Sequence, residues 1–220
     1  MPSLREQTDA RIANTRKNNP NFAKKVDELL SSAEVFQSGA NALDVGQNAP
    51  DFTLPTPLGK SVSLSNLITN GPVVVTFYRG SWCPYCNLQL RAMQQRLPEI
   101  RALGAELAAI SPEMPDNSLS HEEQETLEFP VLSDHDARVA AEYGVAWEVP
   151  ELILEHMRND RNLELSAING GNGSVLPIPA TFVIDRDGVV TWRFVDVDYR
   201  HRAEPDDIIH ALKQLSKQTA

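Results

Sequence analysis

The stretch that decides the fold is Val73-Val74-Val75-Thr76-Phe77-Tyr78, followed by Arg79-Gly80-Ser81 and then by Trp82-Cys83-Pro84-Tyr85-Cys86. The first six residues form a near-continuous β-branched and aromatic run, which is typical of a central strand covered on both faces. The next three residues predict a turn. Pro84 predicts the first position of a helix, where the N–H that proline lacks would be unpaired anyway. The sequence therefore places a C-x-x-C pair between a buried strand and a helix.

Strands and helices alternate after this junction. Further strands are predicted over 60–64, 106–111, 129–132, 181–184 and 189–195, and helices over 84–96, 98–104, 117–127, 134–143, 148–162 and 205–215. Asp185-Arg186-Asp187-Gly188 predicts a tight hairpin between the last two strands. The order predicts an α/β fold with a central mixed β-sheet flanked by helices. Residues 148–176 fit the alternation poorly, and we interpret them as an insertion that is either a lid or specificity loop, or surface padding.

The first 45 residues are predicted to be a helical arm that precedes a main domain over 46–220. Two helix-permissive segments, 4–17 and 21–38, are separated by the helix-breaking sequence Asn18-Asn19-Pro20. The second segment has apolar residues at helical spacing. The arm is too small to fold alone. We expect it to pack either on its own domain or against a second copy of the chain in a homodimer.

Charge and hydropathy exclude several classes of protein. The chain has 220 residues with 20 Lys+Arg and 30 Asp+Glu, which gives a formal net charge of −10. This balance argues against nucleic acid and against a membrane as partners, because phosphate binding needs clustered Lys and Arg. No apolar run approaches the ~20 residues of a membrane-spanning helix, and the first residues lack the apolar region of a secretory signal. We therefore expect a cytoplasmic protein, in a compartment that keeps thiols reduced.

The two cysteines have three possible uses: zinc binding, core packing and redox chemistry. A zinc site needs about four ligands, whereas the chain has one C-x-x-C and five scattered histidines, so we expect neither a metal nor another cofactor. The predicted helix start places Cys83 where the helix dipole stabilises a thiolate, which is the reactive form of cysteine. Cys86 lies one turn along the same helix and can close a small disulfide ring suited to reversible exchange.

Several neighbours of the pair are candidates for shaping the site. Arg79 is the nearest cation and either lowers a thiol pKa or is a solvated charge at the strand end. Trp82 and Tyr85, on either side of Cys83-Pro84, either shape a substrate surface or cover the helix end. Ser111-Pro112-Glu113 is predicted to be a loop beside the site. Pro179 precedes the strand 181–184, where a proline is either an ordinary trans residue or holds a cis bond that turns the backbone toward a thiol substrate.

Several segments of the sequence resemble the alkyl hydroperoxide reductase/thiol-specific antioxidant (AhpC/TSA) family, the peroxiredoxins and peroxiredoxin-like proteins of the thioredoxin fold. The resemblance is carried by Ala49-Pro50-Asp51-Phe52-Thr53-Leu54, Gly59-Lys60, Val62-Ser63-Leu64, residues 72–78, the C-x-x-C, and Thr181-Phe182-Val183-Ile184-Asp185-Arg186-Asp187-Gly188. It implies a thioredoxin-like fold over residues 45–217 and thiol-dependent redox activity.

The redox centre departs from the family pattern P-x-x-x-T-x-x-C. Aligned from Phe77-Tyr78, the family proline falls on Arg79, the threonine on Cys83 and the peroxidatic cysteine on Cys86, while the family's distant arginine falls on Pro179. Trp-Cys-x-x-Cys and a proline before a strand are instead similar to thioredoxins, which implies a cis bond at Pro179 and a position for Thr181 near the thiols. Two assignments stay open: the helix terminus makes Cys83 the attacking thiol, and the peroxiredoxin register makes it Cys86.

Our first functional hypothesis is a thiol-dependent peroxidase that reduces hydrogen peroxide or organic hydroperoxides. The cycle would pass through a sulfenic acid and a Cys83–Cys86 disulfide, which a thioredoxin-like or small-thiol reductant would reopen. The alternatives are a thiol–disulfide oxidoreductase acting on protein disulfides and a non-catalytic redox sensor or binding module.

Overall fold

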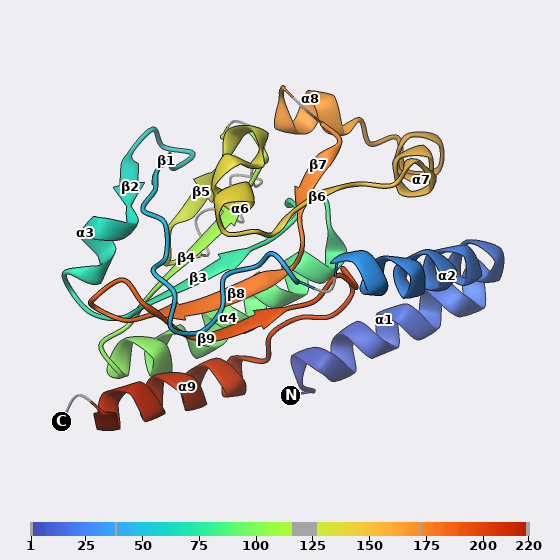
Figure 1. The fold of residues 1–220 in the computed structure, drawn as a ribbon. Helices are drawn as coiled ribbons and strands as arrows, with labels where there is room; N and C mark the ends of the chain where they lie inside the picture. Colours follow the sequence, from blue (N-terminus) through green and yellow to red (C-terminus); the bar gives the residue numbers. More distant parts are fainter. Residues whose placement is uncertain (1, 38, 116–126, 172, 219–220) are drawn as a thin grey trace.

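The centre of the molecule is a five-stranded mixed sheet, seen in a computed structural model (Figure 1). The structure describes residues 2–37, 39–115, 127–171 and 173–218. The strand order is β5-β4-β3-β8-β9, with β3 (Val73–Phe77) in the middle. β4 (Glu106–Ser111) runs parallel to β3, and β5 (Val131–Ser133) runs parallel to β4. On the other side, β8 (Ala180–Ile184) is antiparallel to β3, and β9 (Val190–Val195) is antiparallel to β8.

The central strand is covered on both faces, as its apolar run predicts. All five residues of β3 are buried. Val73, Val75 and Phe77 join one apolar cluster, and Val74 and Tyr78 join a second cluster on the opposite face of the sheet. This alternation is the period of two that a strand imposes on its side chains. The predicted mixed sheet flanked by helices is confirmed.

The helix that follows the cysteine pair is longer than predicted. α4 is continuous over Pro84–Ala102 and contains Pro98 in its interior, so the predicted break at this proline is wrong. Leu97 and Ile100 on either side of it are fully buried. Pro98 removes one helical hydrogen bond, and the burial of these neighbouring side chains offsets that loss. α9 (Pro205–Gln218) packs beside α4 (Figure 1).

The shorter elements differ more from the sequence-based expectation. β1 (Thr53–Pro55) and β2 (Ser61–Ser63) form an antiparallel two-stranded ribbon, and the short helix α3 (Leu64–Ile68) follows it. The helix predicted over 134–143 is divided into a 3₁₀ turn, η1 (His135–Ala137), and α6 (Arg138–Glu142), because Ala137 between them is left-handed with φ 52°. The helix predicted over 117–127 lies almost wholly outside the described residues.

The predicted insertion has a structure of its own. It contains β6 (Ala146–Glu148), α7 (Glu151–Arg161), α8 (Leu165–Asn169) and β7 (Val175–Pro177). β6 and β7 pair as an antiparallel two-stranded ribbon, which the sequence did not reveal. The ribbon closes the insertion at its base and leaves α7 beside the arm (Figure 1).

The N-terminal arm is a pair of helices that packs on its own domain. α1 (Leu4–Asn18) and α2 (Pro20–Gln37) agree with the predicted segments. Ile12 joins the apolar cluster of the cysteines, and Val26 and Leu30 join the other cluster. A homodimer through the arm stays a prediction. Within the described ranges, no helix is both long and apolar enough to cross a membrane.

Leu30→Ala tests how strongly the arm contributes to the fold. Leu30 is 3% exposed, so we expect the free energy of unfolding to fall by about 2–4 kcal/mol. Chemical denaturation followed by circular dichroism measures the change. Leu29→Ala, at the half-buried neighbour, is the matched control and should cost about 1 kcal/mol or less. Equal losses for the two variants would contradict the packing of α2 described above.

Candidate active site

The cysteine pair lies at the junction of β3 and α4, as predicted. Cys83 is the N-cap residue of α4 with extended backbone, and Pro84 is the first helical residue. The Cys83 carbonyl accepts hydrogen bonds from the N–H groups of Cys86 and Asn87, at 3.0 and 3.1 Å. Both cysteines are free thiols, with 1% and 0% of their surface exposed. The geometry therefore places Cys83 at the positive end of the helix dipole.

The loop before the pair is held by a buried carboxylate. Glu113 accepts hydrogen bonds from the N–H and the hydroxyl of Ser81, both at 2.8 Å. The Asn87 side-chain amide donates to the Ser81 carbonyl, also at 2.8 Å. Glu113 is 2% exposed, and it follows β4 in the loop that the sequence predicts beside the site. These three bonds fix the turn from which Cys83 projects.

Glycine is required at position 80 of this turn. Gly80 has φ 146°, and a Cβ atom there would lie 2.3 Å from Nε1 of Trp82. The Trp82 ring therefore lies directly against the Gly80 backbone. The Cys83 N–H donates to the Gly80 carbonyl at 3.1 Å, so the same residue positions both the indole and the nucleophile.

Arg202 contacts both sulfur atoms and was missed by the sequence analysis. Its Nη2 donates to Sγ of Cys86 at 3.2 Å and lies 4.0 Å from Sγ of Cys83. Its Nη1 donates to the carbonyls of Tyr199 and His201, and the side chain is buried. The available signal is Tyr199-Arg200-His201-Arg202, a cationic cluster in an acidic chain, between the last strand and the last helix.

The segment that carries Arg202 is fastened by a buried ion pair. Asp198 accepts hydrogen bonds from Nε and Nη2 of Arg200 at 2.8 and 2.7 Å. Asp27 of α2 accepts from Nη1 of Arg200 at 2.6 Å. Burial raises the pKa of Asp198, but the hydrogen bonds from Arg200 outweigh it and hold this pKa below its ordinary value. The arm is thus tied to the loop that presents Arg202.

Arg79 is a buried cation beside the pair. Its side chain is 3% exposed, and Nε and Nη2 have no hydrogen-bond acceptor among the described residues. The guanidinium carbon lies 4.3 Å from the centre of the Tyr199 ring and 5.1 Å from that of Trp82. Aromatic faces attract the cation, so the two rings hold Arg79 in place without neutralising it.

The two thiols have opposite pKa shifts. Burial alone raises the pKa of Cys83, but the hydrogen bond from Cys86 and the positive charges of Arg79 and Arg202 hold it well below its ordinary value. Burial and the thiolate of Cys83 raise the pKa of Cys86 well above its ordinary value. These directions favour the thiolate on Cys83, with the Cys86 thiol as its hydrogen-bond donor.

The cis bond predicted at Pro179 is wrong, because no peptide bond in the described part of the chain is cis. Pro179 lies between β7 and β8, and the backbone passes through it in extended form. The Ile178 N–H donates to the Val145 carbonyl at 2.7 Å, and the Pro179 carbonyl accepts from the Asp196 N–H at 3.2 Å. The unpredicted ribbon of β6 and β7 thus leads into β8 through a segment that is hydrogen-bonded at both Ile178 and Pro179.

Thr181 hydrogen-bonds to the neighbouring strand. Its Oγ1 lies 2.9 Å from Oγ1 of Thr76 on β3, which also accepts a bond from the Gln89 side-chain amide at 2.8 Å. All three residues are buried. This network joins β8 and β3 to α4, and it supports the helix that carries the cysteines. A direct role of Thr181 toward the thiols stays a prediction.

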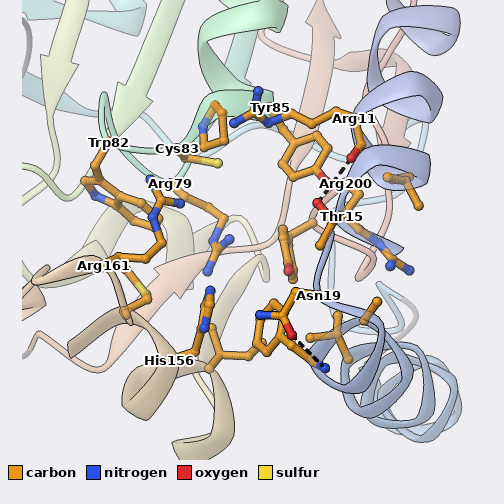
Figure 2. A pocket seen from close by; sticks show the side chains of 18 of the residues that line it. Arg11, Thr15, Asn19, Arg79, Trp82, Cys83, Tyr85, His156, Arg161 and Arg200 are labelled. Atoms are coloured by element: carbon orange, nitrogen blue, oxygen red, sulfur yellow. Dashed lines mark hydrogen bonds between the residues drawn. The ribbon is translucent and has the colours of Figure 1, made fainter. Parts of the chain in front are cut away.

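A pocket with a volume of about 160 Å³ opens at Cys83 (Figure 2). Its walls come from the arm, from α7 of the insertion, from the cysteine loop and from the segment at Tyr199. The predicted neighbours Arg79, Trp82, Pro84 and Tyr85 all line it, whereas Pro179 and Thr181 do not.

Within the described ranges, no group of three or more His, Cys, Asp or Glu side chains is placed to hold a metal ion.

Comparison with known proteins identifies the family. The AhpC/TSA family model matches residues 45–193. The chain is 32% identical to peroxiredoxin Bcp of Escherichia coli over 105 residues, 48% of this chain and 67% of that protein. It is 29% identical to the chloroplastic peroxiredoxin Q of Populus jackii over 187 residues, 85% of this chain and 74% of that one. The crystal structure of peroxidoxin BcpB from Mycobacterium tuberculosis superposes with a TM-score of 0.60 at 25% identity, covering 79% of this chain and 98% of that one.

The chain belongs to the AhpC/TSA family. The thioredoxin-like fold that the resemblance implies is confirmed by these structural neighbours. The register expected from the sequence, with Arg79 and Cys83 at the positions of the family proline and threonine and Pro179 at that of the distant arginine, stays a prediction. Arg202 provides a guanidinium at the sulfur atoms from a different segment of the chain.

Arg202→Met tests whether this guanidinium stabilises the thiolate. In the unchanged protein the rate of Cys83 alkylation by iodoacetamide should stay high well below pH 9.0, the ordinary thiol pKa, and fall only as the pH drops through the lowered pKa. The variant loses a positive charge near the sulfur, so its midpoint should move upward by about one pH unit or more. Peptide mass mapping of the alkylated cysteine across a pH series measures both curves.

Arg202→Lys is the matched control, because it keeps the charge and loses the planar guanidinium. Its midpoint should lie between those of the other two proteins. Coincident midpoints for the unchanged protein and Arg202→Met would overturn this role of Arg202.

Proposed function

We propose that this protein is a thiol peroxidase that reduces hydroperoxides, with Cys83 as the attacking thiol and Cys86 as the resolving thiol. The observation that carries the proposal is a cysteine with a lowered pKa that opens onto a pocket and has a second thiol within hydrogen-bonding reach. The peroxiredoxin names of its relatives agree with this chemistry.

Two features favour Cys83 over Cys86 as the nucleophile. Cys83 lines the pocket and caps the N-terminus of α4, whereas Cys86 is fully buried and does not line the pocket. The shifted pKa values also place the thiolate on Cys83. The thiolate is the nucleophilic form of cysteine, so the residue that replaces the family threonine performs the attack in this proposal.

The first step is attack by the Cys83 thiolate on one oxygen of the hydroperoxide. The O–O bond breaks, the attacked oxygen keeps its hydrogen so that Cys83 becomes a sulfenic acid, and the other oxygen takes up a proton from water and departs as an alcohol or water. Arg79 and Arg202 stabilise the negative charge that passes from sulfur to the departing oxygen. Because these cations are already in place around a buried sulfur, little reorganisation accompanies the charge movement.

The second step uses the short spacing of the pair. Cys86 loses its proton and attacks the Cys83 sulfur, the sulfenic oxygen leaves as water, and a disulfide closes. When a reductant later attacks Cys83, Cys86 departs as a thiolate. Arg202 lies nearer to Cys86 than to Cys83, so it also stabilises this leaving group.

Burial of both thiols limits the size of the substrate and of the reductant group that can reach them. The reactants approach Cys83 through the pocket, which favours small hydroperoxides over protein disulfides as substrates. We propose a dithiol reductant of thioredoxin type or a small thiol, in a reducing compartment such as the cytoplasm. A redox sensor with the same pair would show oxidation without repeated turnover.

Single-cysteine variants test the assignment of roles. Cys83→Ser should lower peroxide consumption at least about 10³-fold, because it removes the covalent pathway. Cys86→Ser should still consume one equivalent of peroxide, with a first-turnover rate within about tenfold of the unchanged protein, since it raises the pKa of Cys83 but leaves the nucleophile. Stopped-flow kinetics and a sulfenic-acid-specific label followed by mass spectrometry measure both.

The opposite pattern, with a labelled sulfenic acid on Cys86 and full first turnover in Cys83→Ser, would assign the attack to Cys86, as the family register implies. Normal turnover in both variants would contradict the peroxidase function itself.

A further inference from the structure

The pocket beside Cys83 is cationic although the protein is acidic. Five arginines line it, Arg11, Arg16, Arg79, Arg161 and Arg200, together with the ring of His156 and the Cys83 thiolate. No Asp or Glu occurs among the described residues of this lining, while the chain as a whole has a formal net charge of −10. An anion is the ligand that such a lining attracts.

Some of these side chains contact a carboxylate that does not line the pocket. Asp27 pairs with Arg16 at 3.1 Å and with Arg200 at 2.6 Å. His156 contacts Asp160 at 2.6 Å and stacks on Phe22, with ring centroids 3.7 Å apart. These contacts join the arm to the insertion and shape the pocket. They leave Arg11, Arg79 and Arg161 as the charges available to a ligand.

Arg79 has the geometry of an anion receptor. Its faces are occupied by the rings of Tyr199 and Trp82, so new hydrogen bonds must form in the plane of the guanidinium. Nε and Nη2 share one edge of that plane, and both are buried without an acceptor among the described residues, so an anion reaches this edge by displacing a neighbouring side chain. A carboxylate accepts two parallel bonds from such an edge, and a buried donor that lacks an acceptor costs free energy. Figure 2 shows Arg79 between the arm residues on one side and Trp82 and Arg161 on the other.

The rest of the lining is apolar. Phe22 and Val26 of α2 and Ile153 and Met157 of α7 face the pocket together with Cys83. A small organic acid matches this combination, because its carboxylate meets Arg79 while its carbon skeleton lies against the apolar side chains. The small volume of the pocket favours a carboxylate over a bulkier phosphate ester.

We propose that the pocket formed by the arm, α7 and Arg79 is a binding site for the carboxylate of a small organic molecule that reacts at Cys83. Resting on the proposed function, this inference narrows the substrate class to molecules with an acidic group. Two sources share that chemistry: a carboxylate-bearing hydroperoxide that oxidises Cys83, and a carboxylate-bearing thiol that reduces the disulfide. Arg11 and Arg161 draw the anion in, and Arg79 fixes its position.

Paired alkylating reagents test the site without requiring peroxidase activity. Iodoacetate carries a carboxylate, iodoacetamide is its neutral counterpart, and both react with the same Cys83 thiolate. The ratio of their rate constants is therefore independent of the thiol pKa and reports attraction of the anion. In Arg11→Gln and Arg161→Gln this ratio should fall roughly fivefold for each charge removed, measured by mass mapping of Cys83 under pseudo-first-order conditions.

Arg158→Gln is the matched control. Arg158 lies on the same helix as Arg161 but pairs with Glu151 and does not line the pocket. The substitution removes the same formal charge, so its ratio should stay within about twofold of the unchanged protein. Equal ratios in Arg11→Gln, Arg161→Gln, Arg158→Gln and the unchanged protein would overturn the proposal, even if the protein proves to be an active peroxidase.

Two kinetic comparisons then distinguish the sources of the carboxylate. The first comparison is between a carboxylate-bearing hydroperoxide and its methyl ester in single-turnover oxidation of Cys83. The second is between 3-mercaptopropionate and 2-mercaptoethanol in reduction of the Cys83–Cys86 disulfide. Preference for the acid in one comparison, lost in Arg161→Gln, identifies that reactant as the natural ligand. Absence of any acid preference in both comparisons would contradict the site.

Discussion

A negative charge on a sulfur atom that solvent does not reach must be balanced by protein groups, and this requirement organises the active-site end of the molecule. Cys83 is 1% exposed, so water contributes little to the stability of its thiolate. The compensation comes from the proton shared by Cys86 and from two guanidinium groups, those of Arg79 and Arg202. Each of these groups is itself buried, and burying an uncompensated ion of either sign is costly. The thiolate and its cations therefore stabilise one another.

The cations are held by contacts that extend across the fold. Arg202 is fixed by two main-chain carbonyls of its own segment, and Asp198 and Arg200 attach this segment to Asp27 of the arm. Glu113 fixes the turn before Cys83 from the neighbouring strand. The position of one sulfur atom thus depends on the arm, on the loop after β4 and on the loop after β9. A functional site of this kind needs the complete tertiary structure and not the C-x-x-C motif alone.

Local signals predict the core of the structure, and long-range contacts account for the errors. The strand at Val73, the helix start at Pro84 and the hairpin at Gly188 each rest on residues adjacent in sequence, and each is confirmed. Arg202 lies 119 positions from Cys83, and nothing near the cysteines indicates it. The hydrogen-bond partners at Ile178 and Pro179 are Val145 and Asp196, which are distant in sequence, and the unbroken helix at Pro98 depends on the packing around it.

The reactive cysteines and the walls of their pocket lie in different segments of the chain. The family match covers residues 45–193, so both cysteines and Arg79 lie within the matched part of the chain. Arg11 lies in the arm, before the matched residues, and Arg161 lies in the insertion. The arm and the insertion meet through the stacked rings of Phe22 and His156, and together with the cysteine loop they form the pocket at the start of α4. Because the walls of this pocket come from the arm and α7, these two segments decide which molecules reach the Cys83 thiolate.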